Sequence, residues 1–193
     1  KNLEIHRLGH SAGSILLGHL SDRLVSQKIN IASLGLYAPA CTMDFATDFL
    51  GRALKAKRIS KRRVSFDVLS DGRERDDSVG PYGKSLLYLV SRALEEVHKT
   101  PLLGLAATWD ANDPKDIVNR KRHREVAAWL KLWGNGPKPT IHKQRQVSDG
   151  QGMIPIAHGS FDNDVAVVSN SIASILGIEA NKLAVPVTNL RGF

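Results

Sequence analysis

Cysteine and long apolar stretches are scarce in this chain. Cys41 is the single cysteine among 193 residues, so no internal disulfide can form. We therefore expect a reducing, cytoplasmic location. Cys41 lies in an apolar run, which favours a buried thiol over a reactive one. No apolar run reaches the roughly 18–20 residues of a transmembrane helix, so we expect no membrane span.

Clusters of metal-ligating residues and phosphate-binding loops are also missing, so neither a metal nor a cofactor is expected. Hydrophobic residues make up 42% of the chain, which excludes global disorder. The length suits one domain with a substantial core, and we predict a single domain over residues 1–193.

Positive charge is abundant, with a formal net charge of +8. Two runs, at 52–63 and 120–124, hold much of it. The first run has no interleaved aromatic residues of the kind that stack on bases, so nucleic-acid binding is not favoured. A solvated helix face is the simplest interpretation, and attraction to an acidic partner is the alternative.

Residues 9–13 read GHSAG and fit the pattern G-x-S-x-G. The apolar residues of 3–8 alternate partly, as in a strand, and those of 14–25 recur at helical spacing. A strand, a tight turn and a helix in this order are the context of a nucleophile elbow. We therefore predict that Ser11 is a nucleophile at the tip of this turn.

Small neighbours are needed around so sharp a turn, and Gly9, Ala12 and Gly13 are small. Ser11 would lie at the start of the following helix, where free N–H groups favour negative charge. The N–H of Ala12 could donate to the oxyanion of an acyl-transfer intermediate. His10 flanks the nucleophile and is expected to pack or to shape the pocket.

Strand and helix patterns alternate along the rest of the chain, which predicts an α/β fold with a mostly parallel sheet and flanking helices. Ligands of such sheets bind beyond the carboxyl ends of the strands. The predicted strands are 29–36, 64–69, 101–108 and, at an edge, 140–147. The predicted helices are 44–59, 84–98, 116–133 and 164–176, with Gly177 as the stop of the last.

A serine hydroxyl needs a base to take its proton, and an imidazole suits this role near neutral pH. Among the seven histidines, His158 is the first candidate because it lies on a glycine-containing loop just before the last helix. His142, in the predicted edge strand, is the alternative.

The acid that orients the base is expected between Ser11 and His158 in chain order. The loop 70–81 is rich in acidic residues and follows the predicted strand 64–69. Asp77 is the first candidate, Asp71 and Asp76 are alternatives, and Asp44 is a weaker one.

These features together resemble the C-terminal half of an α/β-hydrolase of the serine esterase or lipase type, over nearly the whole chain. The resemblance implies hydrolysis of a carboxylic ester, thioester or amide, with a small-molecule ester or acyl substrate. Ser11 would be the nucleophile, His158 the base and Asp77 the acid. Residues 44–62 correspond to the place where such enzymes often carry a cap or lid.

Folds of this family normally place several strands before the elbow, and here only residues 1–8 precede it. The N-terminal strands and the second oxyanion donor are therefore expected to be missing from this chain. A sheet without them has one unpaired edge, which favours self-association. A non-catalytic module that binds an acidic partner through its basic face is the alternative function.

Overall fold

The computed structural model describes residues 3–109 and 123–190, and a parallel sheet forms its centre. The sheet has the order β1-β2-β3-β4, and all its pairs are parallel. Its strands are β1 (His6–His10), β2 (Ser33–Tyr37), β3 (Val64–Leu69) and β4 (Thr140–His142). The predicted α/β class with a parallel sheet and flanking helices is thereby confirmed.

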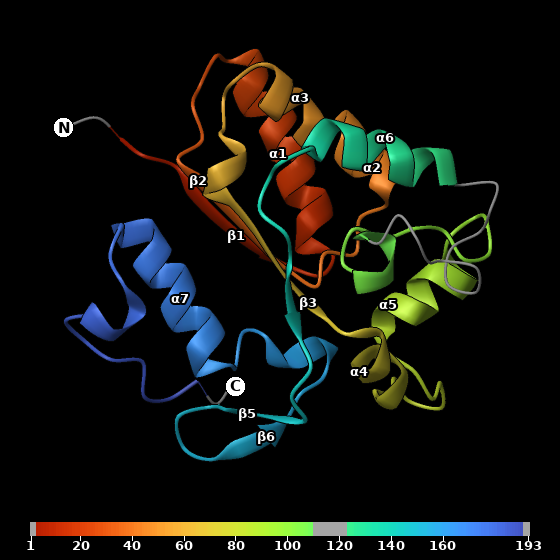
Figure 1. Ribbon diagram of the computed structural model, residues 1–193, viewed down its shortest axis with the longest axis vertical. Helices are drawn as coiled ribbons and strands as arrows, with labels where there is room; N and C mark the ends of the chain where they lie inside the picture. Colours follow the sequence, from red (N-terminus) through yellow and green to blue (C-terminus); the bar gives the residue numbers. More distant parts are fainter. Residues whose placement is uncertain (1–2, 110–122, 191–193) are drawn as a thin grey trace.

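Helices cover the sheet on both sides (Figure 1). α1, α2, α3 and α6 lie on one side, α7 lies on the other, and α4 and α5 follow the carboxyl end of β3. The α-helices are α1 (Gly13–Ser26), α2 (Met43–Asp48), α3 (Leu50–Lys55), α4 (Asp71–Asp76), α5 (Leu86–Leu89), α6 (His123–Trp133) and α7 (Val165–Leu176).

Shorter elements complete the chain. β5 (Gln146–Ser148) and β6 (Met153–Pro155) form an antiparallel hairpin outside the main sheet. A π-helical turn, Val90–Leu94, extends α5. Single 3₁₀ turns are η1 (Lys61–Arg63), η3 (Ala106–Trp109), η5 (His158–Ser160) and η6 (Ala180–Lys182).

The two faces of the sheet differ in polarity. Alternate residues of a strand point to opposite faces, and Leu34, Leu36 and Phe66 are buried in the core shared with α1 and α6. The other face carries polar residues: the hydroxyl of Tyr37 donates to Ser171 of α7, and Asp67 accepts from His142. Parallel sheets buried on both faces usually have continuous apolar strands, so this alternation marks the α7 side as a polar layer.

The predicted strand at 101–108 is wrong. Leu102 makes a single isolated bridge with Thr42, and the segment then turns, with the N–H of Leu105 donating to the carbonyl of Leu102. The free edge of β3 is taken by β4, so the apolar residues of 101–108 pack as a buried turn beneath the end of β2. Gly104 makes this possible, because a Cβ there would lie 2.5 Å from the carbonyl oxygen of Pro39.

Other predictions hold in part. The predicted helix 44–59 is two helices that meet at Phe49, and 84–98 is helical over 86–94. The expected loop 70–81 contains α4, whose first turn is capped by the hydroxyl of Ser70. The predicted helix 116–133 is seen over 123–133, and its beginning falls outside the described residues.

Residues 44–62, the predicted cap, include α3 and most of α2, and Ala46, Leu50 and Ala53 are buried in the core. Their role as a cap remains a prediction. Cys41 is buried, as expected, and burial raises the pKa of its thiol to about 12. The helix predicted at 164–176 is confirmed, and it ends where Gly177 adopts a φ of +69°.

One edge of the sheet is formed by β1, which pairs with β2 alone among the described strands. Leu8 on this strand is 44% exposed. The expected self-association at this edge stays a prediction. Within residues 3–109 and 123–190, no helix has both the length and the apolar character that crossing a membrane requires.

Candidate active site

Ser11 lies at a strained turn between β1 and α1. Its φ is +51°, in the left-handed region that L-residues other than glycine, asparagine and aspartate rarely adopt. The N–H of Ser11 donates to the carbonyl of Tyr37 at 2.9 Å. Its carbonyl accepts from the N–H groups of Ser14 and Ala40, at 3.0 and 3.1 Å, and from the Ser14 hydroxyl at 2.7 Å. Such strain persists only where the surroundings hold it in place, and these four bonds do so.

The two glycines of the motif have different roles. A Cβ on Gly9 would lie 2.6 Å from Cδ1 of Leu17 and 3.3 Å from the backbone of Gly13, so glycine at this position leaves room for the close packing of β1 against α1. A Cβ on Gly13 would meet nothing within 4 Å. The steric requirement predicted for both positions is therefore found at Gly9.

His158 contacts Ser11, the predicted nucleophile. Its Nε2 lies 2.8 Å from Oγ of Ser11, within the reach of a general base. With the serine hydroxyl donating to Nε2, the neutral ring carries its proton on Nδ1. This Nδ1 is buried and has no hydrogen-bond partner among the described residues.

The surroundings keep His158 uncharged. Burial lowers its pKa to about 4, and the nearby charge of His10 acts in the same direction. The carboxylates of Asp77 and Asp162 oppose this shift, to a smaller extent than burial. The imidazole is therefore neutral at pH 7, which is the state that can accept a proton.

Asp77 is the predicted acid that the structure brings to His158. Its Oδ2 accepts from the backbone N–H of His158 at 2.8 Å, and its Oδ1 accepts from the N–H of Ser78 at 2.7 Å. The carboxylate thus lies beside the base, although it bonds the backbone of His158 rather than Nδ1 of the ring.

The alternative acids are engaged elsewhere. Asp71 accepts from the hydroxyl of Tyr88 and pairs with Arg75 at 2.8 Å, and Asp76 pairs with Arg73. Asp44 lies exposed in the first turn of α2.

Glu74, in the middle of α4, is fully buried, and its carboxyl bonds the hydroxyl of Ser85. Burial raises its pKa to about 8, and the charges of Asp77 and Asp71 add to the shift. Glu74 is therefore mostly protonated at pH 7, so it adds little negative charge beside Asp77. Sequence reasoning missed this residue because its burial depends on how α4 packs against the segment that follows it.

Ala12, the predicted oxyanion donor, precedes the first residue of α1. No side chain caps this end of the helix, and the N–H of Ala12 makes no backbone bond within the described residues. The amide is therefore free to donate to an anion formed at Ser11.

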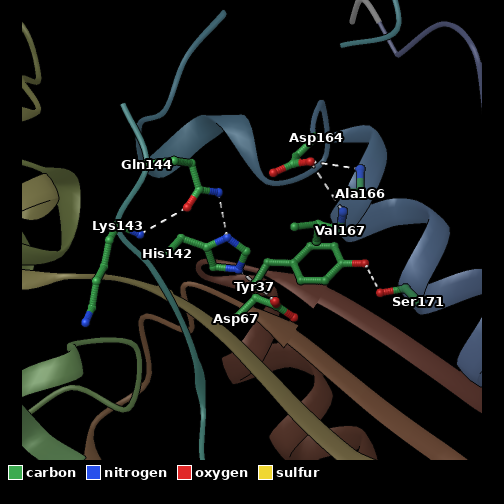
Figure 2. Close-up of polar contacts among 9 residues, drawn as sticks. All are labelled: Tyr37, Asp67, His142, Lys143, Gln144, Asp164, Ala166, Val167 and Ser171. Atoms are coloured by element: carbon green, nitrogen blue, oxygen red, sulfur yellow. Dashed lines mark hydrogen bonds and ion pairs between the residues drawn. The ribbon is translucent and has the colours of Figure 1, made fainter. Parts of the chain in front are cut away.

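The alternative base, His142, is fully occupied on the polar face of the sheet (Figure 2). Its Nε2 lies 2.9 Å from Oδ1 of Asp67, and its Nδ1 lies 3.1 Å from Nε2 of Gln144. With an acceptor on one nitrogen and a donor on the other, the ring has no nitrogen left for a serine.

Two further residues adjoin the base. His10 Nε2 lies 2.8 Å from the carbonyl oxygen of His158, and its Nδ1 lies 3.8 Å from Oδ2 of Asp162. Sequence reasoning assigned His10 a packing role and missed Asp162. The signal that could have found Asp162 is its place four residues after His158 in the same loop.

The chain matches no family model, no curated protein and no solved structure. The function proposed below therefore depends on the geometry of the described residues.

Proposed function

We propose that this chain is a serine hydrolase that cleaves a carboxylic ester, or a related thioester or amide, through an acyl-Ser11 intermediate. The observation that carries the proposal is the 2.8 Å contact between Oγ of Ser11 and Nε2 of His158, made at a turn where Ser11 has a φ of +51°. A nucleophile in contact with a neutral buried base is the arrangement that acyl transfer requires.

The reaction has two halves. Oγ of Ser11 attacks the carbonyl carbon while Nε2 of His158 takes the hydroxyl proton, and the N–H of Ala12 donates to the oxyanion. His158 then returns the proton to the leaving group, which departs as an alcohol, thiol or amine. In the second half, water attacks the acyl-serine while Nε2 of His158 takes a proton from it, the bond between the acyl carbon and Oγ breaks, and His158 returns the proton to Oγ as a carboxylic acid is released.

The order of the elements supports membership of the α/β-hydrolase fold. The serine follows β1, the acid follows β3, and the histidine comes after β4 and the β5–β6 hairpin, with β1, β3 and β4 in one parallel sheet. Serine, acid and histidine follow one another in this order in α/β-hydrolases. We propose that β1 to β4 are the C-terminal part of such a sheet.

The alternative, a non-catalytic module that binds an acidic partner, has less support. The nitrogen Nη1 of Arg52 lies 2.7 Å from Oδ1 of Asp22, and Lys61 and Arg63 donate to the carbonyls of Leu132 and Ala32. These contacts use part of the basic run 52–63 within the chain itself.

Labelling with a fluorophosphonate, read by mass spectrometry of the modified peptide, tests the proposal. We expect modification at Ser11, none in Ser11→Ala, and undiminished labelling in the matched variant Ser26→Ala, which alters an exposed serine at the end of α1. Absence of labelling in the native chain, with the fold confirmed by circular dichroism, would contradict the hydrolase and favour the binding module.

A further inference from the structure

His10, the residue between Gly9 and the nucleophile, contacts the loop that carries the base. Its Nε2 lies 2.8 Å from the carbonyl oxygen of His158, and the two ring centroids are 5.2 Å apart. Its ring edge also meets Phe161, at a centroid distance of 6.3 Å. One residue of the elbow thus touches the base loop at several points.

The chemistry of the contact fixes the tautomer of His10. A carbonyl oxygen can only accept, so Nε2 of His10 carries a proton and donates it. This bond exists whether Nδ1 is protonated or not. The carboxylate of Asp162 lies 3.8 Å from that Nδ1, which is beyond ordinary hydrogen-bond distance.

The backbone of His158 is held on both sides. Its N–H donates to Asp77 at 2.8 Å, and its carbonyl accepts from His10 at 2.8 Å. Phe161, which is 1% exposed, anchors the same loop between Tyr37 and His142. The ring of His158 makes one hydrogen bond among the described residues, to Ser11, so its direction depends on these backbone contacts.

We infer that His10 is a positioning residue, which holds the carbonyl of His158 so that Nε2 of the base faces Oγ of Ser11. The inference rests on the proposed function, and it gives the residue before the nucleophile a specific task. Because His10 and Ser11 are neighbours in the chain, two consecutive residues of the elbow contact His158, one through its backbone carbonyl and the other through its ring.

The charge of His10 provides a second readout. The titratable groups that act on His158 are His10, Asp77 and Asp162, and protonated His10 opposes protonation of the base. Replacing His10 by a neutral residue is therefore expected to raise the pKa of His158. This rise follows from the loss of charge alone, so we expect it in every neutral replacement, and the hydrogen bond to the carbonyl of His158 is tested separately.

Three variants separate donation from packing. His10→Gln keeps a side-chain N–H donor, His10→Phe keeps a ring without a donor, and His10→Ala keeps neither. We expect roughly a tenfold fall in the labelling rate and in kcat for His10→Phe, with KM nearly unchanged, because one positioning hydrogen bond is lost. His10→Gln should stay within about threefold of the native chain, and His10→Ala should fall at least as far as His10→Phe.

Nitrogen NMR of the ring of His158 gives a result that does not depend on catalysis. We expect the Nε2 signal to move toward that of a free imidazole in His10→Phe and to stay near its native position in His10→Gln. Equal rates and unchanged ring signals in all three variants would overturn the inference, as would equal losses in His10→Gln and His10→Phe. If the native chain is not labelled, the hydrolase proposal fails, and the NMR comparison still decides whether His10 positions His158.

Discussion

Two histidines lie toward the carboxyl end of the sheet, the half-buried His142 at the end of β4 and the buried His158 in η5, and they differ in what their nitrogens contact. His158 has Nε2 on Ser11 and an Nδ1 without a hydrogen-bond partner among the described residues. His142 has both nitrogens engaged, by Asp67 and Gln144. A histidine works as a base through a nitrogen that can exchange a proton with the substrate or nucleophile. His142 links Asp67 to Gln144 on the polar face of the sheet (Figure 2), whereas the proposed base, His158, has its Nε2 on Ser11.

The largest expected effect comes from removing each of the two histidines in turn. His158→Ala should lower kcat and the labelling rate by at least about 10³-fold, because Ser11 loses the group that takes its proton. His142→Ala, the matched variant at the other histidine, should stay within about tenfold of the native chain. The measurement is ester turnover together with fluorophosphonate labelling.

Circular dichroism of both variants controls for unfolding. If His142→Ala abolished labelling in a folded chain while His158→Ala did not, the assignment of the base would be reversed.

Asp77 gives the next largest effect. Asp77→Asn keeps an oxygen that can accept from the backbone N–H of His158 and removes the charge beside the base. We expect a loss of roughly 10²-fold in kcat, because the imidazolium that forms during the reaction is no longer stabilised. Asp76→Asn, which alters an exposed carboxylate paired with Arg73, is the matched control and should leave kcat unchanged. Equal kcat values for Asp77→Asn and Asp76→Asn would show that Asp77 has no role in catalysis.

The pH dependence of kcat/KM sharpens the comparison further. The base must be neutral to accept a proton, and the pKa of His158 is lowered to about 4, chiefly by burial. Activity should therefore persist as the pH falls through 6.5, the ordinary value for histidine, and decline as it approaches 4. An acid limb centred near 6.5 would show that the base is solvated rather than buried.

The free energy of unfolding should also depend on the protonation of His158. The unfolded chain takes up a proton at His158 near pH 6.5, and the folded chain does so only near 4. The free energy of unfolding should therefore decrease as the pH falls between these values. Circular dichroism along the titration separates loss of the fold from protonation of the base.

The contrast between the two histidines was only partly visible in the sequence. The elbow at Ser11 and the late position of His158 could be predicted because they depend on local order along the chain. The bond between His142 and Asp67 could not, since it joins residues 75 positions apart on neighbouring strands. Among the acids of the loop 70–81, the sequence placed Asp77 first and left Asp71 and Asp76 as alternatives, because the formation of α4 decides where each carboxylate lies.

The elements of the fold were likewise predictable only where they depend on local sequence. The strand at 64–69 and the helix at 164–176 were predictable from periodicity and capping, whereas the apolar run 101–108 looked like a strand and is a buried turn. An apolar run shows that a segment is buried, but its partner in the sheet is set by long-range pairing. Here β4, a short and polar strand, occupies the place beside β3.

The smallest expected effect concerns the pair formed by Asp67 and His142, whose side chains are 16% and 10% exposed. Asp67→Asn keeps an oxygen that accepts from Nε2–H of His142 and loses only the charge. We expect a decrease of about 1 kcal/mol or less in the free energy of unfolding, measured by urea denaturation at pH 7. Labelling at Ser11 should stay within about threefold, because the nitrogens of His142 bond Asp67 and Gln144, and its ring meets the base loop at Phe161. A tenfold loss of labelling without a change in stability would mean that the polar face of the sheet takes part in positioning His158, and the two histidines would then form one functional unit.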